Sequence, residues 1–259
     1  MIENSEKEIS RELPFAAPCR ELETGAPIKW LKLGWQDLRR APKQSLTYGA
    51  VMLVVSYIIS LLAYYTGELS FFLSLVSSFI FMGPVIAIGL YSISCQLNLG
   101  LKPRLGYCLR EGRRYMGDEL IFAFILLIVF LIWARAASMV HVFFPIEADP
   151  EMKKLLVFFS IGTFIGAIFT ALIFTISAFS LPMIMDKKVD MITAIVTSIN
   201  AVLRNKKVLL LWGIIIVALV ILGLLTAMIG LVVLLPLIGH ATWHAYKDTI
   251  DASAWPGHE

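Results

Sequence analysis

Residues 208–246 read VLLLWGIIIVALVILGLLTAMIGLVVLLPLIGHATWHAY, and this stretch decides the fold of the 259-residue chain. It contains no Asp, Glu, Lys or Arg and is bounded by Lys206, Lys207 and Lys247. A single straight helix of this length would rise about 58 Å, whereas the hydrocarbon core of a bilayer is about 30 Å thick. The stretch therefore predicts two short crossings joined by a tight turn near residues 226–230.

The composition extends this prediction to the whole chain. Hydrophobic residues make up 58% of the sequence and charged residues only 16%, and the mean hydropathy is +0.80. Soluble domains carry about 25% charged residues, so a separate soluble domain is not expected. Six crossings of about 20 residues each would occupy roughly half of the chain. We therefore predict a helical integral membrane protein.

The predicted fold is all-α, with six transmembrane helices in three helical hairpins, each preceded by an amphipathic helix on the cytoplasmic surface. The membrane domain would occupy residues 27–248. A flexible cytoplasmic tail is expected over residues 1–26, where charges alternate in sign and prolines interrupt any helix. A short cytoplasmic tail, 249–259, would follow. The expected spans cover about 45–65, 69–92, 120–140, 155–185, 208–225 and 229–246.

The orientation follows from the lysines and arginines of the connecting segments. Three basic segments alternate with connections that are acidic or uncharged. Because positive residues stay on the cytoplasmic side, both termini are expected in the cytoplasm of a bacterial inner membrane. These side chains suit anionic lipid headgroups better than nucleic acid. Those nearest the spans are Arg39, Arg40, Arg113, Arg114, Arg204, Lys206 and Lys207.

A surface helix is predicted to start at Pro27. Ile28, Leu31, Trp35 and Leu38 fall on one helical face, and lysines and arginines lie largely on the other. Tryptophan and leucine opposite a basic face are typical of a helix that lies in the headgroup layer.

The connecting segments also suggest an internal repeat, in which a surface helix leads into a crossing and a kinked crossing back. The repeat would give pseudo-threefold packing around a central site, unless hairpins with basic flanks simply look alike. The first two copies contain Leu33-Gly34-Trp35 before Arg39-Arg40 and Leu105-Gly106-Tyr107 before Arg113-Arg114. The third copy contains Ile192, Ile195, Val196, Ile199, Val202 and Leu203. The expected kinks are at Pro84, Pro182 and Pro236.

Two histidines near the end of the last predicted span are candidate functional residues. His240 and His244 are four positions apart, so they share one helical face and could bind a metal or a haem. The neighbouring Trp243 and Tyr246 are typical of an interfacial belt. We therefore favour interfacial or packing histidines and expect no metal and no cofactor.

Other candidate residues lie within the middle spans. Arg135 is the only strongly charged residue well inside a predicted crossing, which makes it a candidate functional residue by default. It lies near the outer end, close to His141, where its long side chain can also reach the interface. Gly162, Gly166 and Thr170 form a small-residue face that suits helix packing, and we favour a contact within the subunit.

Two stretches of the sequence resemble a known family. Together they resemble the bacterial integral membrane family DUF2189, over nearly the whole chain. The resemblance implies a six-helix protein of the bacterial inner membrane, and it brings no catalytic residue and no substrate. The first stretch contains Leu13-Pro14, Ala17-Pro18, Trp30-Leu31, Gly34-Trp35-Gln36-Asp37-Leu38-Arg39 and Ser45-Leu46-Thr47-Tyr48-Gly49. The second is Leu235-Pro236-Leu237-Ile238-Gly239-His240-Ala241-Thr242-Trp243-His244-Ala245-Tyr246.

Three functions are compatible with these patterns. The chain has no P-loop, G-x-S-x-G, H-E-x-x-H or C-x-x-C motif, so we expect no enzyme and favour an accessory or organising component of the membrane. Such a component would contact lipid and a possible membrane-protein partner. A small-solute transporter or channel is the second function, and a polar cavity lined by Arg135, Ser77 or Ser78 would favour it. The third is a haem- or metal-binding protein that uses His240 and His244.

Overall fold

The computed structural model describes residues 14–66, 83, 87–104, 116–143 and 152–257. Within these ranges the chain is helical, apart from turns and two isolated antiparallel bridges, Cys19–Ile250 and Lys187–Gly257. The all-α fold is therefore confirmed. The helices are α2 (Ala26–Arg40), α3 (Pro42–Thr66), α5 (Ile88–Asn98), α7 (Met116–Phe143), α8 (Met152–Ser177), α9 (Ser180–Asp186), α10 (Met191–Arg204), α11 (Lys206–Leu225) and α12 (Leu231–Thr249).

Four helices in the described ranges are long and apolar enough to cross a membrane, rather than the six that we expected. They are Pro42–Leu62, Leu120–Val140, Met152–Asp186 and Lys206–Leu225. These segments agree with the first, third, fourth and fifth predicted spans. Most of the second predicted span, residues 69–92, lies outside the described residues.

The sixth predicted span is a helix, but it is not one of the four apolar candidates. After a turn at residues 226–230, as predicted, α12 runs from Leu231 to Thr249. Its second half is polar and buried inside the protein, where its side chains pair with other helices. The uncharged sequence predicted that α12 is a membrane span, but most of its apolar residues lie in its first half.

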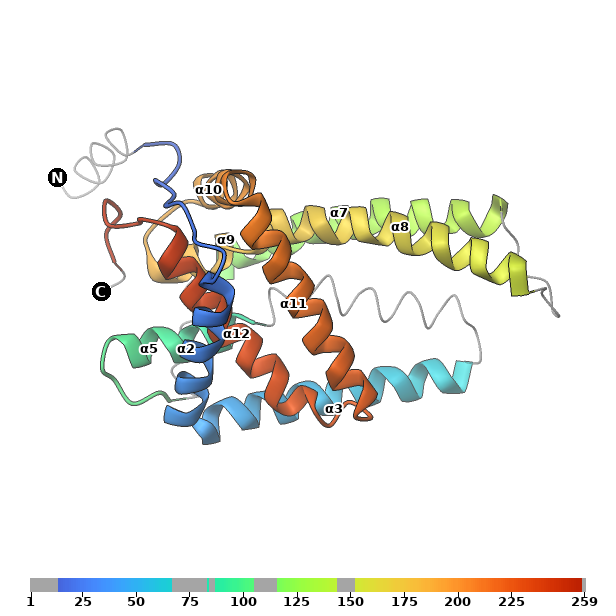
Figure 1. The fold of residues 1–259 in the computed structure, drawn as a ribbon, viewed down its shortest axis with the longest axis horizontal. Coiled ribbons are helices and arrows are strands. Elements are labelled where there is room, and N and C mark those ends of the chain that lie inside the picture. The colour runs from blue at the N-terminus through green and yellow to red at the C-terminus, as the bar shows by residue number, and fades with distance from the viewer. Residues whose placement is uncertain (1–13, 67–82, 84–86, 105–115, 144–151, 258–259) are drawn as a thin grey trace.

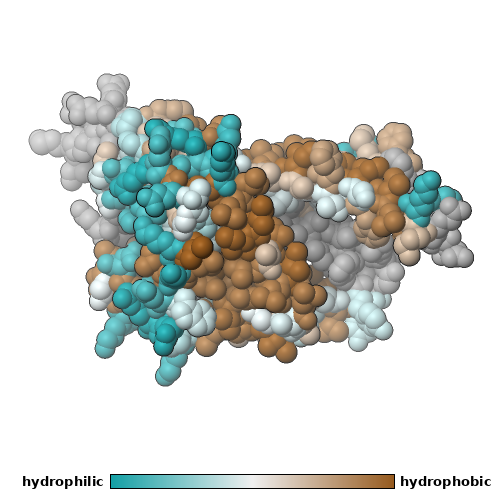
Figure 2. Space-filling model, viewed as in Figure 1, coloured by the Kyte–Doolittle hydropathy of each residue, from teal (hydrophilic) through white to brown (hydrophobic). Residues whose placement is uncertain are grey.

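The helices form a bundle with two unlike ends (Figure 1). The helices α3, α7 and α8 extend toward one end, whereas α2, α5, α10 and the described terminal segments gather at the other. Hydrophilic residues concentrate at the end that holds α2, and hydrophobic residues cover α11 (Figure 2). This surface pattern fits a bundle inserted in a bilayer, with one broad polar end outside it.

The centre of the described bundle is α12, which other helices approach at backbone distance. A Cβ atom added at Gly34 of α2 would lie 2.7 Å from the backbone nitrogen of Ala241 and 3.0 Å from the carbonyl oxygen of Leu237. A Cβ atom added at Gly49 of α3 would overlap the carbonyl group of Val232. Glycine therefore lets α2 and α3 contact the backbone of α12 directly, as small residues do between membrane helices.

The helix α2 forms as predicted, and most of the residues that pack against the protein lie outside the face expected in the headgroup layer. Trp30, Gly34 and Asp37 are buried, and the indole of Trp30 packs edge-on against Trp212 of α11 at 5.6 Å between ring centroids. Of the residues expected to face the headgroup layer, Ile28 and Trp35 are 58% and 44% exposed, whereas Leu38 is buried. Gly34 on the buried face allows the close approach to the backbone of α12. 

The described part of the predicted N-terminal tail, residues 14–25, is bound to the C-terminal segment. The backbone nitrogen of Arg20 donates to the carbonyl oxygen of Thr249 at 2.8 Å, and that of Asp251 donates to Pro18 at 2.9 Å. The prediction of a free tail is therefore wrong for this part of the chain. Prolines prevented a helix here, but they left the extended backbone free to pair with another segment.

Replacing Gly34 by alanine should separate α2 from α12. Overpacking of this kind typically costs about 1–3 kcal/mol of unfolding free energy, because a rigid backbone blocks the added methyl group. Gly166→Ala on α8 is the matched control, since its Cβ atom would meet no described atom within 4 Å. Unfolding in mixed detergent micelles measures both effects. Equal stability of the two variants would contradict the packing described here.

Candidate functional site

A line of polar side chains runs along α12 and is called the seam here; it consists of His240, His244, Tyr246 and Asp248. These four residues face α2, α3, α5 and α9 through hydrogen bonds. Their spacing along one helix brings them to successive levels of the bundle.

His240 lies at the deepest level of the seam, with none of its surface exposed. Its Nε2 lies 2.9 Å from Oγ of Ser45 on α3, and its Nδ1 lies 2.8 Å from Oγ of Ser94 on α5. Each hydroxyl can donate or accept, so a neutral imidazole is satisfied at both nitrogens. The ring therefore joins three helices without a buried charge.

His244 lies one turn further along and contacts α2. Its Nε2 is 2.8 Å from Oδ2 of Asp37, and the two side chains are only 12% and 3% exposed. Asp37 could not be recognised from the sequence as a partner, because the predicted apolar face of α2 did not include it. The contact fixes α2 against α12 in addition to the close approach at Gly34.

The seam ends in two carboxylate contacts at the polar end of the bundle. Asp248 accepts hydrogen bonds from Lys29 Nζ at 2.8 Å and Trp30 Nε1 at 2.9 Å. The hydroxyl of Tyr246 donates to Asp186 of α9 at 2.8 Å. The carboxylates therefore connect α12 to both α2 and α9.

The environment of Asp248 shifts its pKa. Burial raises the pKa of this carboxyl, but the hydrogen bonds from Lys29 and Trp30 and the charges of Lys29 and Arg20 outweigh burial and lower the pKa below its ordinary value. Asp248 is therefore ionised at neutral pH. Its contribution to folding stability is present above the unfolded-state pKa and is lost as the pH falls through the lower folded-state value.

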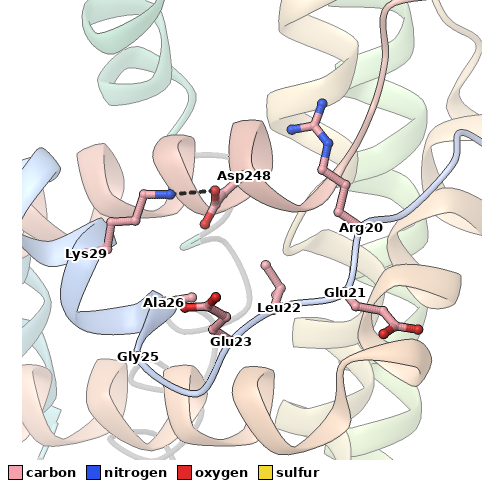
Figure 3. A pocket seen from close by; sticks show the side chains of 8 residues that line it. All are labelled: Arg20, Glu21, Leu22, Glu23, Gly25, Ala26, Lys29 and Asp248. Atoms are coloured by element: carbon pink, nitrogen blue, oxygen red, sulfur yellow. Dashed lines mark hydrogen bonds and ion pairs between the residues drawn. The ribbon is translucent and has the colours of Figure 1, made fainter.

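A pocket of about 420 Å³ opens beside Asp248, between the N-terminal segment and the start of α2 (Figure 3). The Lys29–Asp248 contact forms one side, and the backbone around Gly25 forms another. Arg20 lies above the pocket and donates to the carbonyl oxygen of Lys247 at 3.3 Å. The lining is mostly charged and has no histidine, cysteine or serine. It consists of Arg20, Glu21, Leu22, Glu23, Gly25, Ala26, Lys29 and Asp248.

The predicted pair His240 and His244 does not converge on one ligand position. Each ring is directed to a different helix and already has hydrogen-bond partners. Among the described residues, no group of three or more His, Cys, Asp or Glu side chains could hold a metal ion.

The other predicted site residues do not gather with the seam. Arg135 is exposed on α7, and His141 lies near the C-terminal end of the same helix. The structure places Arg39, Arg40, Arg204, Lys206 and Lys207 on the surface of the polar end. Arg113 and Arg114 lie outside the described residues, as do Ser77 and Ser78.

The predicted packing face on α8 has no partner in the described part of the chain. Atoms added as Cβ at Gly162 and Gly166 would meet nothing described within 4 Å, and Thr170 is exposed. The expected contact within the subunit is therefore absent from these residues. The glycines that do pack, such as Gly34 and Gly49, lie outside any G-x-x-x-G pattern.

The predicted kinks have different outcomes. The helix containing Pro182 is interrupted at residues 178–179, between α8 and α9, so the chain changes course just before this proline. Pro236 lies inside α12, which remains helical on both sides. Pro84 lies outside the described residues.

The comparison with protein families decides the broad class of the chain. Residues 71–186 match the family described as "Predicted integral membrane protein (DUF2189)". The match covers less than half of the chain. The resemblance stated from the sequence is thus confirmed, but over a shorter part of the chain than expected. No curated protein and no solved structure matches the chain.

The DUF2189 match and the polar seam overlap only in part. The matched residues include α5, α7, α8 and α9, which contribute Ser94 and Asp186 to the seam. The two stretches that carried the resemblance, within residues 13–56 and 235–246, lie outside the match. They contribute α2, part of α3 and the second half of α12, so they meet in the folded protein.

Removing the imidazole of His240 should destabilise the bundle strongly. The variant His240→Ala leaves two buried hydroxyls without their partner and opens a cavity, for an expected loss of about 2–4 kcal/mol. Ser94→Ala should cost less, and the effects of the two substitutions should be non-additive because the groups are in contact. Unfolding of the single and double variants in mixed micelles measures this coupling. A His240→Ala variant as stable as the parent protein would contradict the role of the seam.

Acidification should weaken the contact between α2 and α12 at Asp248. Since the pKa of Asp248 is lowered on folding, Asp248→Asn should reduce stability at pH 7, by less than about 1 kcal/mol for a partly exposed ion pair. The difference between the parent protein and this variant should shrink as the pH falls through the lowered folded-state pKa of Asp248, where the parent carboxylate becomes protonated. Unfolding free energies at pH 7 and pH 3 measure it. A difference that grows on acidification would reverse the assigned sign.

Proposed function

We propose that the protein is a non-enzymatic, multi-pass component of the bacterial inner membrane that organises another membrane protein or the surrounding lipid. The observation that carries this proposal is the uncovered apolar surface of its spans. At most 22% of the residues in the apolar window of any of the four candidate spans are buried inside the protein. Most of each span is therefore available to lipid or to a protein partner.

The use of the interior polar groups supports a non-enzymatic role. His240 and His244 are occupied in joining helices. Tyr246 and Asp248 have partners on α9 and α2. Catalysis needs groups that reach a substrate, whereas these groups are hydrogen-bonded to residues of neighbouring helices.

The position of the terminal segments supports a topology with both termini in the cytoplasm. The backbones of residues 18–20 and 249–251 are hydrogen-bonded to each other at the polar end of the bundle. Arg39, Arg40, Lys206 and Lys207 are exposed at the same end. Positive residues favour the cytoplasmic side of a membrane, so this end is assigned to the cytoplasm.

Photocrosslinking in native membranes tests the organising role. A photoreactive amino acid would replace one exposed residue on each span: Val54, Phe124, Phe164 or Leu210. A discrete adduct with a second protein is expected from one or two of the helices, because a binding face covers part of the surface only. Leu126, which is fully buried on α7, is the matched control for Phe124 and should give no such adduct. Crosslinks to lipid alone at all four positions would overturn a role through protein contacts.

A further inference from the structure

The helix α10 buries a mainly small and polar face, whereas a surface helix of a soluble protein normally buries its apolar face. Its buried residues are Met191 and the small or polar Thr193, Ala194, Thr197, Ser198 and Ala201. Its other large apolar residues lie on the opposite side, where Ile195 and Val202 also touch the edge of the core. Ile192 and Leu203 are 63% and 55% exposed, and Ile195, Val196, Ile199 and Val202 are half-buried.

Hydrogen bonds hold the polar face of α10 inward. Thr197 Oγ1 accepts from the backbone nitrogen of Ala17 at 3.0 Å. Ser198 Oγ donates to the carbonyl oxygen of Thr175 at 2.8 Å and accepts from the backbone nitrogen of Phe179 at 3.2 Å. A rotation that buried the aliphatic face would leave these buried groups unpaired, which is costly. The aliphatic face is therefore held outward by the fold itself.

The next helix places this outward face at a membrane boundary. Only Asn205 separates α10 from α11, which begins at Lys206 and is the most hydrophobic of the four candidate spans. Asn205 is itself fixed, because its Oδ1 accepts from the backbone nitrogen of Leu22 at 2.9 Å. Since α11 enters the bilayer here, the aliphatic face of α10 lies where the acyl chains begin.

Positive charge gathers at the same junction. Arg204, Lys206 and Lys207 are exposed around the start of α11. The nearest described carboxylate, Glu21, lies 3.6 Å from Arg204 in an exposed ion pair. An exposed pair of this kind is weak, so it leaves the guanidinium able to bind another anion. The juxtaposition of aliphatic and basic residues is typical of a helix that binds an anionic lipid surface.

We propose that α10 is an in-plane membrane anchor that binds anionic phospholipids. Its aliphatic face lies among the upper acyl chains, and Arg204, Lys206 and Lys207 bind the lipid phosphates. The proposal deepens the proposed function and rests on it for the cytoplasmic position of α10. Continuity with α11 and the local charge favour lipid over a protein partner or a second copy of the chain as the occupant of this face.

The first experiment measures whether α10 lies in the bilayer. An environment-sensitive fluorescent amino acid would replace Leu203 in the full-length protein, reconstituted in vesicles of phosphatidylcholine and phosphatidylglycerol. Lipids brominated near the top of the acyl chain should quench this probe at least about twofold more than a probe at Asn200, which is exposed outside the aliphatic face. A probe at Ile192 should behave like the probe at Leu203. Equal quenching at all three positions, or a crosslinked protein covering Leu203, would overturn the anchor.

The second experiment measures the choice of lipid. Bromine is placed on phosphatidylglycerol alone or on phosphatidylcholine alone, and quenching of the Leu203 probe gives the relative affinity for the two headgroups. We expect about a three- to tenfold preference for phosphatidylglycerol that falls at high salt. The variant R204Q/K206Q/K207Q should lose this preference while its probe remains quenched. An unchanged preference in the variant would overturn the phosphate-binding role.

These outcomes are independent of the test for the organising role. Photocrosslinking on α3, α7, α8 and α11 reports protein contacts of the spans, whereas lipid quenching reports the position and charge of α10. Lipid quenching without protein adducts would therefore overturn an organising role through protein contacts and support the anchor. Protein adducts without quenching would do the reverse.

Discussion

The hydrogen bonds of His240 are the constraint on which the described bundle depends. An imidazole without exposed surface must have partners at both ring nitrogens, and Ser45 and Ser94 supply them from two other helices. This requirement fixes the rotation of α12 about its axis. Once that rotation is fixed, His244 faces Asp37 and Asp248 faces Lys29, because residues four apart lie on the same side of a helix.

Close backbone packing makes this constraint possible. The hydroxyl of Ser45 reaches His240 because α3 lies against α12, and Gly49 removes the side chain that would keep them apart. Gly34 likewise lets α2 lie against α12, so that Asp37 reaches His244. In lipid there is no hydrophobic driving force for helices to associate, because the acyl chains are as apolar as the side chains. Close packing and hydrogen bonds between helices are therefore the main sources of specificity in a membrane bundle. The two kinds of contact support each other along α12.

The sequence predicted the parts of this fold that depend on composition. Long uncharged runs indicated α3, α7, α8 and α11, because a bilayer sets the length of an apolar helix. The sequence could not predict hydrogen bonds between residues that are distant along the chain. The histidines of α12 were recognised, but Ser45, Ser94 and Asp37 are common residue types that become partners only in the fold. Periodicity also showed which residues of α2 and α10 share an apolar face, but not which residues of the opposite face pair with other helices.

The outward aliphatic face of α10 follows from the same physical difference between lipid and water. In water, a helix buries its large apolar side chains because exposing them is unfavourable. At the membrane boundary that penalty disappears, and the limiting cost becomes an unpaired polar group inside the protein. Thr197, Ser198 and Asn205 have their partners only when their face points inward. The polar residues therefore determine the orientation of α10, and its aliphatic residues face the lipid as a consequence.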